Sequence, residues 1–243
     1  MSEKQTDYTG QRIGEYEILA HRETHHGIAL YAAQERQQQT PALLYLAIAD
    51  DGADRFKRQV SLLSQLSHPG IPPVLETGVT AQKQPYAIVT ELRGTLLAER
   101  LAAAEPYSVL EALRLVQQVT EILSVLHPAG IIHQDLRPEY ILLGEDGQPR
   151  LLHLGLAGEK RPFDPTASTA DYAAPEQQEG HPANSQSNIY SLGVILYELL
   201  AGQRPPLPQS QWDVFHRDEP RLPLPMAEVK SGLTEATYRV VKQ

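Results

Sequence analysis

The side chains that could take part in chemistry are concentrated in the second half of the chain. Asp135 and Arg137 place a carboxylate and a guanidinium two residues apart, and His153 follows eighteen residues after Asp135. Because imidazole suits zinc or copper, His153 with His25 or His26 is one candidate transition-metal site. A neutral, hydrogen-bonded histidine is the plainer interpretation. The chain contains no cysteine, which excludes a thiolate nucleophile, a disulfide and Cys-ligated zinc.

The elements that must position these residues form two groups along the chain. Short apolar runs separated by polar segments, which are typical of β-strands, dominate the sequence up to Leu92. Beyond Leu92, apolar residues recur at helical spacing. We therefore expect an α+β protein with a flexible tail at residues 1–10, a β-rich lobe at 11–92 and a mainly helical lobe at 93–243. The main helices are expected at residues 53–66, 108–127 and 187–201.

Charge and hydropathy argue against several classes of function. The net charge of −9 disfavours a nucleic-acid surface and contact with an anionic membrane. The longest apolar run, residues 189–201, is too short to span a bilayer and contains Glu198. The first ten residues are too polar for a signal peptide. We expect a cytoplasmic protein, or the cytoplasmic part of a longer membrane-anchored one.

Five segments resemble motifs of protein kinases and occur in the order found in that family. Residues 130–143 resemble the catalytic loop, which reads His-Arg-Asp-Leu-Lys-Pro-Glu-Asn-Ile-Leu in the family. The other four are similar to helix C and the turn after it, the Asp-Phe-Gly segment, the Ala-Pro-Glu motif and the central helix of the C-lobe, and they lie at residues 55–71, 151–157, 172–176 and 188–202. Each motif alone is modest, but five in order are specific.

The resemblance runs from Ile13 to Gln243 and is to the bacterial-type (Hanks-type) Ser/Thr protein kinase domain. It implies a two-lobed protein-kinase-like fold, with a β-rich N-lobe and a mainly helical C-lobe. Because the family's C-lobe extends further, we expect the C-terminal helices to be truncated. The missing helix carries the arginine that pairs with the Ala-Pro-Glu carboxylate, so Glu176 is expected to lack that partner.

Phosphoryl transfer depends on positioning and on neutralising phosphate charge, and this chain departs from the family at the groups that do so. Tyr45 stands at the position of the strand lysine, and residues 5–56 contain no lysine. Gln59 replaces the helix-C glutamate. Tyr140 and His153 replace the Asn and Asp that hold magnesium, although Mg²⁺ prefers hard oxygen ligands. No protein ligand set for a metal is therefore expected.

Other positions of the nucleotide pocket follow from the same alignment. Leu43 replaces the small alanine above the adenine and would intrude on the purine site. Thr90 falls at the gatekeeper position, Glu91 and Leu92 at the hinge, and Leu142 at another position of the nucleotide pocket.

The glycine-rich loop is also altered, because Glu23 occupies one of its glycine positions. Arg22 or Arg36 could in principle reach phosphates in place of the missing lysine. What remains is Asp135 at the catalytic-base position, as a vestige that can simply organise the loop, and Arg137 in place of a lysine.

The sequence therefore predicts a degenerate kinase, or pseudokinase: a non-catalytic regulatory or scaffold module in bacterial Ser/Thr kinase signalling. Its expected partners are proteins, such as an active kinase or its substrate. We expect neither ATP nor Mg²⁺ as cofactor, and we expect Leu43, Tyr45 and His153 to fill the nucleotide cleft. The alternative is a Ser/Thr kinase with weak or atypical ATP-dependent phosphotransfer, which would need ATP and Mg²⁺. A third reading, a decaying gene product, is weakened by the orderly apolar patterning.

Overall fold

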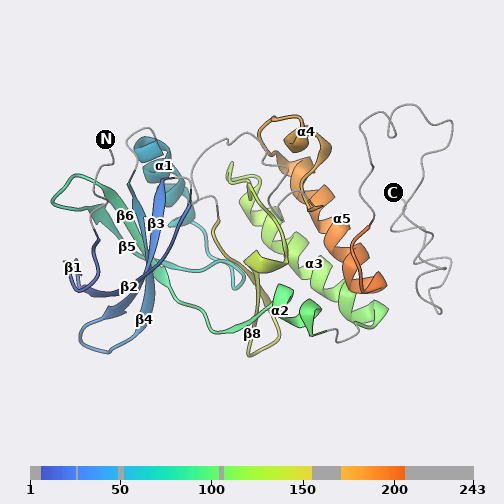
Figure 1. Ribbon diagram of the computed structural model, residues 1–243, viewed down its shortest axis with the longest axis horizontal. Helices are drawn as coiled ribbons and strands as arrows, with labels where there is room; N and C mark the ends of the chain where they lie inside the picture. The colour runs from blue at the N-terminus through green and yellow to red at the C-terminus, as the bar shows by residue number, and fades with distance from the viewer. Residues whose placement is uncertain (1–6, 26, 49–51, 104–106, 155–170, 206–243) are drawn as a thin grey trace.

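The computed structural model describes residues 7–25, 27–48, 52–103, 107–154 and 171–205. These residues form a β-rich lobe and a mainly helical lobe joined by an extended connection (Figure 1). The expected two-lobed α+β fold is thus confirmed. The part of the expected helical lobe at residues 206–243 and the first six residues of the expected tail lie outside the described residues.

The N-lobe is built on a six-stranded antiparallel sheet with the order β1-β2-β3-β4-β6-β5. Its strands are β1 (Arg12–Ile13), β2 (Tyr16–His25), β3 (Ile28–Glu35), β4 (Pro41–Ala47), β5 (Val74–Val79) and β6 (Pro85–Thr90). Helix α1 (Ala53–Leu63) packs against β5 and β6. The helix ends three residues before the predicted boundary. The N–H groups of Gln65 and Leu66 donate to carbonyls three residues earlier, and not four as in an α-helix.

Alternation along β4 assigns its side chains to two different cores. Leu44 and Leu46 belong to a cluster that includes Tyr8 and Tyr31. Tyr45, in contrast, belongs to a larger cluster that contains the buried face of α1 and continues into the helical lobe. Successive side chains of a strand point to opposite faces, so the register of β4 directs Tyr45 toward the space between the lobes.

The prediction of a flexible tail at residues 1–10 is wrong for residues 7–10. Tyr8 is only 2% exposed, and its hydroxyl donates to the side chain of Gln84 at 2.7 Å. The backbone N–H of Gly10 donates to the carbonyl of Ile18 at 2.8 Å. A buried aromatic ring with a satisfied hydroxyl fixes this segment against the sheet, and nothing in its polar sequence indicated that.

Two long helices form the centre of the C-lobe. They are α3 (Val109–Leu126) and α5 (Ser185–Ala201), which lie side by side (Figure 1). The predicted capping box is present, since Ser108 Oγ accepts from the Glu111 N–H at 3.2 Å and the Ser108 N–H donates to the Glu111 carboxylate at 2.8 Å. Helix α5 begins two residues earlier than predicted because the Asn184 side chain caps its first turn.

Shorter elements complete the lobe around these helices. A three-stranded sheet is formed by β7 (Gly94–Leu96), β8 (Ile141–Gly144) and β9 (Pro149–Leu151). The other elements are a one-turn 3₁₀ helix, η2 (Pro138–Tyr140), and two short helices, α2 (Leu97–Ala102) and α4 (Pro175–Gln178). Within the described ranges, no helix combines the length and the apolar character needed to cross a membrane.

The loop before η2 is anchored to α5 by one buried side chain. Asn188, 1% exposed, donates from Nδ2 to the carbonyl of His133 at 2.6 Å and accepts from the His133 N–H at 3.1 Å. Its Oδ1 also lies 3.0 Å from Nε2 of His127. Because buried backbone groups need partners, Asn188 fixes the position of the whole loop relative to the core.

Replacing Asn188 with leucine should therefore destabilise the protein. We expect the free energy of unfolding to fall by about 3 kcal/mol, because two buried backbone groups lose their partners. Chemical denaturation of N188L measures this. Ile189→Ala, at an exposed position of the same helix, is the control and should change stability by less than about 0.5 kcal/mol. Equal effects of the two substitutions would show that Asn188 is not an anchor.

His133 makes stability depend on pH. Burial lowers the pKa of this imidazole from about 6.5 to about 4, although the Leu152 carbonyl, 3.0 Å from Nε2, opposes the shift. The neutral ring is thus favoured in the folded state, while the unfolded chain takes up a proton near pH 6.5. The contribution of His133 is present above pH 6.5 and is lost as pH falls toward 4.

We expect His133 to account for a loss of about 3 kcal/mol of unfolding free energy between pH 6.5 and pH 4. In His133→Phe the stability curve should be flatter over this interval, while Ile189→Ala, at an exposed position without a titratable group, should leave the slope unchanged. Urea denaturation at several pH values measures both. An identical slope in H133F and the unmodified protein would contradict the assignment.

Candidate functional site

Three aromatic side chains meet where the two lobes face each other. The ring of Tyr45, on β4, lies edge-to-face with His153 at a centroid distance of 5.8 Å. The imidazole of His153 in turn lies 4.8 Å from the ring of Tyr140 in η2. Such contacts stabilise a protein by about 0.5–1.5 kcal/mol beyond the area that they bury. The structure therefore brings together three positions predicted to matter for nucleotide and metal.

Tyr45 is 4% exposed, and its hydroxyl is neutral at ordinary pH. Burial and the nearby Glu23 carboxylate raise the pKa of this hydroxyl far above its ordinary value, and a hydrogen bond with the His153 backbone opposes the rise. Gln59 is half-buried and forms no hydrogen bond with Tyr45 in the described part of the chain. Leu43 is also half-buried and packs against the edge of the same core.

His153 has an unusual backbone conformation and a partner in the other lobe. Its φ of +56° lies in the left-handed region, which costs a non-glycine residue about 1–2 kcal/mol. Its Nε2 lies 3.6 Å from the carboxylate of Glu23 in β2. Backbone strain of this kind persists only where surrounding contacts fix it, and here they come from Glu23 and the two tyrosines.

A β-bulge explains how neighbouring residues of β2 both reach toward the C-lobe side. His21 pairs with Tyr31 and Glu23 pairs with Leu30, so Arg22 is the extra residue. Arg22, considered above as a possible phosphate ligand, forms an ion pair at 3.5 Å with Glu91, a predicted hinge position. A bulge changes the direction of the side chains on either side of it, and the sequence carried no indication of this one.

Three other residues predicted to line the nucleotide pocket lie at the end of β6, just after it and in β8. Thr90 is the last residue of β6, and its N–H donates to the carbonyl of Pro73 at 3.1 Å. Leu92, at a predicted hinge position, is half-buried, and Leu142, 6% exposed, lies in β8.

Asp135 and Arg137 pair with each other. Nε of Arg137 lies 3.1 Å from the carboxylate of Asp135, and its Nη2 donates to the hydroxyl of Tyr140 at 3.0 Å. The guanidinium also lies 4.7 Å from the centroid of the Tyr140 ring. One cation thus holds the carboxylate and the ring together, and the Arg137 side chain is only 14% exposed.

Two further contacts in the C-lobe were missed from the sequence. Glu176, expected to lack its usual arginine, accepts a 2.5 Å hydrogen bond from the hydroxyl of Ser187. Tyr172 donates to the carboxylate of Glu198 at 2.6 Å, and burial raises the pKa of that carboxyl. Both pairs are far apart in the chain, so no local pattern could have found them.

The described residues offer no ready metal site. None of them forms a group of three or more His, Cys, Asp or Glu side chains that could hold an ion. The His153 imidazole is engaged by two aromatic rings and by Glu23, and His26 lies outside the described residues.

Comparisons with known proteins agree with the motifs. The model of the protein kinase domain family matches residues 13–229. A probable serine/threonine-protein kinase of Corynebacterium efficiens is 31% identical over 194 residues, which are 74% of this chain and 29% of that protein. The serine/threonine-protein kinase PknA of Mycobacterium tuberculosis is 33% identical over 183 residues, which are 71% of this chain and 42% of that protein.

The match thus spans less than half the length of these relatives. Within that span the catalytic-loop, Ala-Pro-Glu and central-helix segments lie in a two-lobed structure with the loop fixed to α5. Together, the family match and this architecture place the chain in the protein kinase family, among the bacterial serine/threonine kinase domains.

Proposed function

We propose that this domain is a pseudokinase, a non-catalytic regulatory or scaffold module that works through protein partners in bacterial Ser/Thr kinase signalling. The observation that carries the proposal is the contact of Tyr45, His153 and Tyr140 across the cleft. These side chains stand at the three positions where the family has a lysine and two magnesium ligands. A neutral phenol, an imidazole and a second phenol do not fit Mg·ATP.

The expected loss of reaction rate supports an inactive site. Loss of one well-placed electrostatic group typically reduces an enzyme's rate about 10²–10³-fold, and several such groups are replaced here. Such losses are not additive, but the turnover rate that would remain still lies far below the roughly 1–100 s⁻¹ of ordinary kinases. The retained Asp135 is already paired with Arg137, which also contacts Tyr140.

The same contacts give the domain a means of staying closed without nucleotide. Glu23 reaches His153 and Arg22 reaches the hinge from adjacent residues of β2. Tyr45 belongs to an apolar core that contains buried residues of both lobes. A binding surface on such a domain would not depend on the nucleotide supply, which suits a scaffold for an active kinase or for its substrate.

If the domain is a pseudokinase, we expect it to transfer no phosphate from Mg·ATP. Radiolabelled autophosphorylation, with a generic basic protein as added acceptor, should give no signal above background, because the lysine and both metal ligands are replaced. Signal that disappears in Asp135→Ala would contradict the proposal and would favour the alternative, a weak or atypical Ser/Thr kinase.

A separate prediction is that ATP does not bind in the cleft between the lobes. Millimolar ATP, with or without Mg²⁺ or Mn²⁺, should shift the melting temperature of the unmodified protein by less than about 1 °C, because a ligand stabilises only a state that it binds. The double substitution Leu43→Ala with Tyr45→Lys should open the space and produce an ATP-dependent shift.

Calorimetry with the same proteins gives the dissociation constants, and Leu19→Ala, at an exposed position of the N-lobe, is the control. Micromolar ATP binding by the unmodified protein would refute a filled cleft. A folded double variant that still ignores ATP would show that Leu43 and Tyr45 are not what excludes it.

A further inference from the structure

Strand β5 forms one edge of the N-lobe sheet, and its outer side has no backbone partner. The strand pairs with β6 on one side only. Among the described residues, none outside β6 forms a hydrogen bond with the backbone of residues 76–79. A free edge of this kind is a template on which a further strand can pair.

The turn that joins β5 to β6 determines which backbone groups face outward. The Thr80 N–H donates to the carbonyl of Gln84 at 2.8 Å. Hydrogen-bonded pairs alternate along two antiparallel strands, so Gly78 is the next residue of β5 that bonds to β6. The N–H and C=O groups of Thr77 and Val79 therefore point away from β6, toward the free edge.

The exposed side chains along this edge are uncharged. Leu75 and Val79 are 46% and 54% exposed, and Thr77 between them is also exposed. Natural sheets usually protect an edge with lysine, proline or a bulge. The bulge in β5 lies between Val74 and Glu76, and the register with β6 is regular from Glu76 to Val79. An apolar edge, regular over most of its length, is thus left open.

Glu76 adds a negative charge on the other face of the strand. Because side chains alternate along a strand, Glu76 lies on the face opposite to that of Thr77. Its carboxylate accepts from the hydroxyl of Tyr86 at 2.7 Å, and a Cβ on Gly78 would lie 2.6 Å from that hydroxyl, so the glycine makes room for the ring. In the part of the chain that the structure describes, no lysine, arginine or histidine forms an ion pair with Glu76. The half-buried carboxylate can therefore pair with a cation that a partner brings.

This charge distinguishes between two kinds of partner strand. If β5 paired with β5 of a second copy about a two-fold axis at Thr77, Gly78 would lie opposite Glu76, and the carboxylate would gain no cation. An axis at Glu76 itself would oppose two carboxylates. A strand from another protein can instead place a lysine or arginine opposite Glu76, and opposite charges on directly facing residues stabilise a sheet. The charge thus favours a basic strand over self-pairing.

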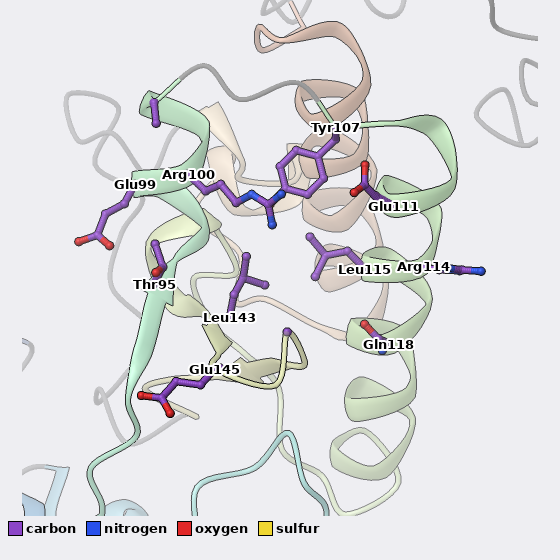
Figure 2. Close-up of a pocket in the computed structure, with 13 residues that line it drawn as sticks. Thr95, Glu99, Arg100, Tyr107, Glu111, Arg114, Leu115, Gln118, Leu143 and Glu145 are labelled. Atoms are coloured by element: carbon purple, nitrogen blue, oxygen red, sulfur yellow. The ribbon is translucent and has the colours of Figure 1, made fainter.

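A pocket of about 630 Å³ in the C-lobe shows no comparable preference. Two arginines and three glutamates line it (Figure 2). The Arg100 guanidinium lies 4.5 Å from the centroid of the Tyr107 ring, and the Glu111 carboxylate accepts from the Ser108 N–H at the start of α3. Charges of both signs line the pocket, so its chemistry favours no single class of ligand.

We propose that β5 is a docking edge for an extended segment of a partner protein, which adds an antiparallel strand to the N-lobe sheet. The segment carries apolar, β-branched side chains opposite Thr77 and Val79 and a lysine or arginine opposite Glu76. The proposal goes beyond the proposed function, because the edge is present whether or not the lobe cleft binds nucleotide.

The probe is the capped peptide acetyl-Ser-Gly-Val-Thr-Val-Lys-Val-Gly-Ser-amide. In the antiparallel register its first two valines lie opposite Val79 and Thr77, and its lysine lies opposite Glu76. Fluorescence anisotropy of the labelled peptide and NMR shifts of residues 75–79 should show saturable binding. The peptide with glutamate in place of lysine should bind at least about 5-fold more weakly, because two carboxylates would face each other. N-methylation of the valine opposite Thr77 should weaken binding at least about 10-fold, because that residue can no longer donate to the edge.

Matched substitutions in the protein test the same contacts. Glu76→Gln keeps an acceptor for Tyr86 and should remove the preference for the lysine peptide over the glutamate peptide. Thr77→Pro removes an N–H that points away from β6, so the sheet should stay folded while peptide binding is lost. Leu19→Ala, at an exposed position of β2, is the control and should change the affinity for the lysine peptide by less than about 2-fold. Circular dichroism and the melting temperature show whether each variant is folded.

Three results with the peptides would overturn the proposal: no saturable binding of the lysine peptide by the unmodified protein, equal affinities for the lysine and glutamate peptides, or an unchanged affinity after N-methylation. A dimer of the unmodified protein in analytical ultracentrifugation that Thr77→Pro abolishes would also overturn it, because the edge would then be occupied by a second copy. None of these results bears on ATP binding, so this proposal and the proposed function can fail separately.

Discussion

The arrangement of this domain depends on the contact of Tyr45 with His153 between the lobes. In the family to which the chain belongs, nucleotide and magnesium occupy the cleft between a β-rich and a helical lobe. Here the register of β4 turns Tyr45 into that space, and the left-handed backbone of His153 presents its ring to the tyrosine. Tyr140 and Arg137 extend the contact to the loop that carries Asp135. Under the proposed function, this aromatic packing takes the place of the charged groups that catalysis would need.

The elements on both sides of this contact are fixed independently of it. On the C-lobe side, Asn188 holds the loop to α5 through both backbone groups of His133. On the N-lobe side, Tyr8 and its hydrogen bonds fix the first described residues against the sheet that carries β4. Rigid supports of this kind let a few side-chain contacts determine the relation of two lobes, because neither partner can relax away at low cost.

Much of the fold could be predicted from the sequence, because apolar periodicity and the Ser108–Glu111 capping box report local structure directly. The site was predictable in part: alignment to known motifs gave Tyr45, Tyr140 and His153, and strand alternation put Leu43 and Tyr45 on one face. The bulge at Arg22, the ion pair of Glu23 with His153 and the burial of Tyr8 could not be predicted. Each depends on residues that are distant in sequence and meet only in three dimensions.

The most direct test of the account is the distance between the lobes in solution. The chain has no native cysteine, so spin labels can be attached specifically through Leu19→Cys and Leu110→Cys, two exposed positions in opposite lobes. Pulsed electron paramagnetic resonance should give one narrow distance distribution that does not change when Mg·ATP is added. A broad distribution that narrows with Mg·ATP would contradict the account, because closure would then come from the nucleotide and not from the side chains of the cleft.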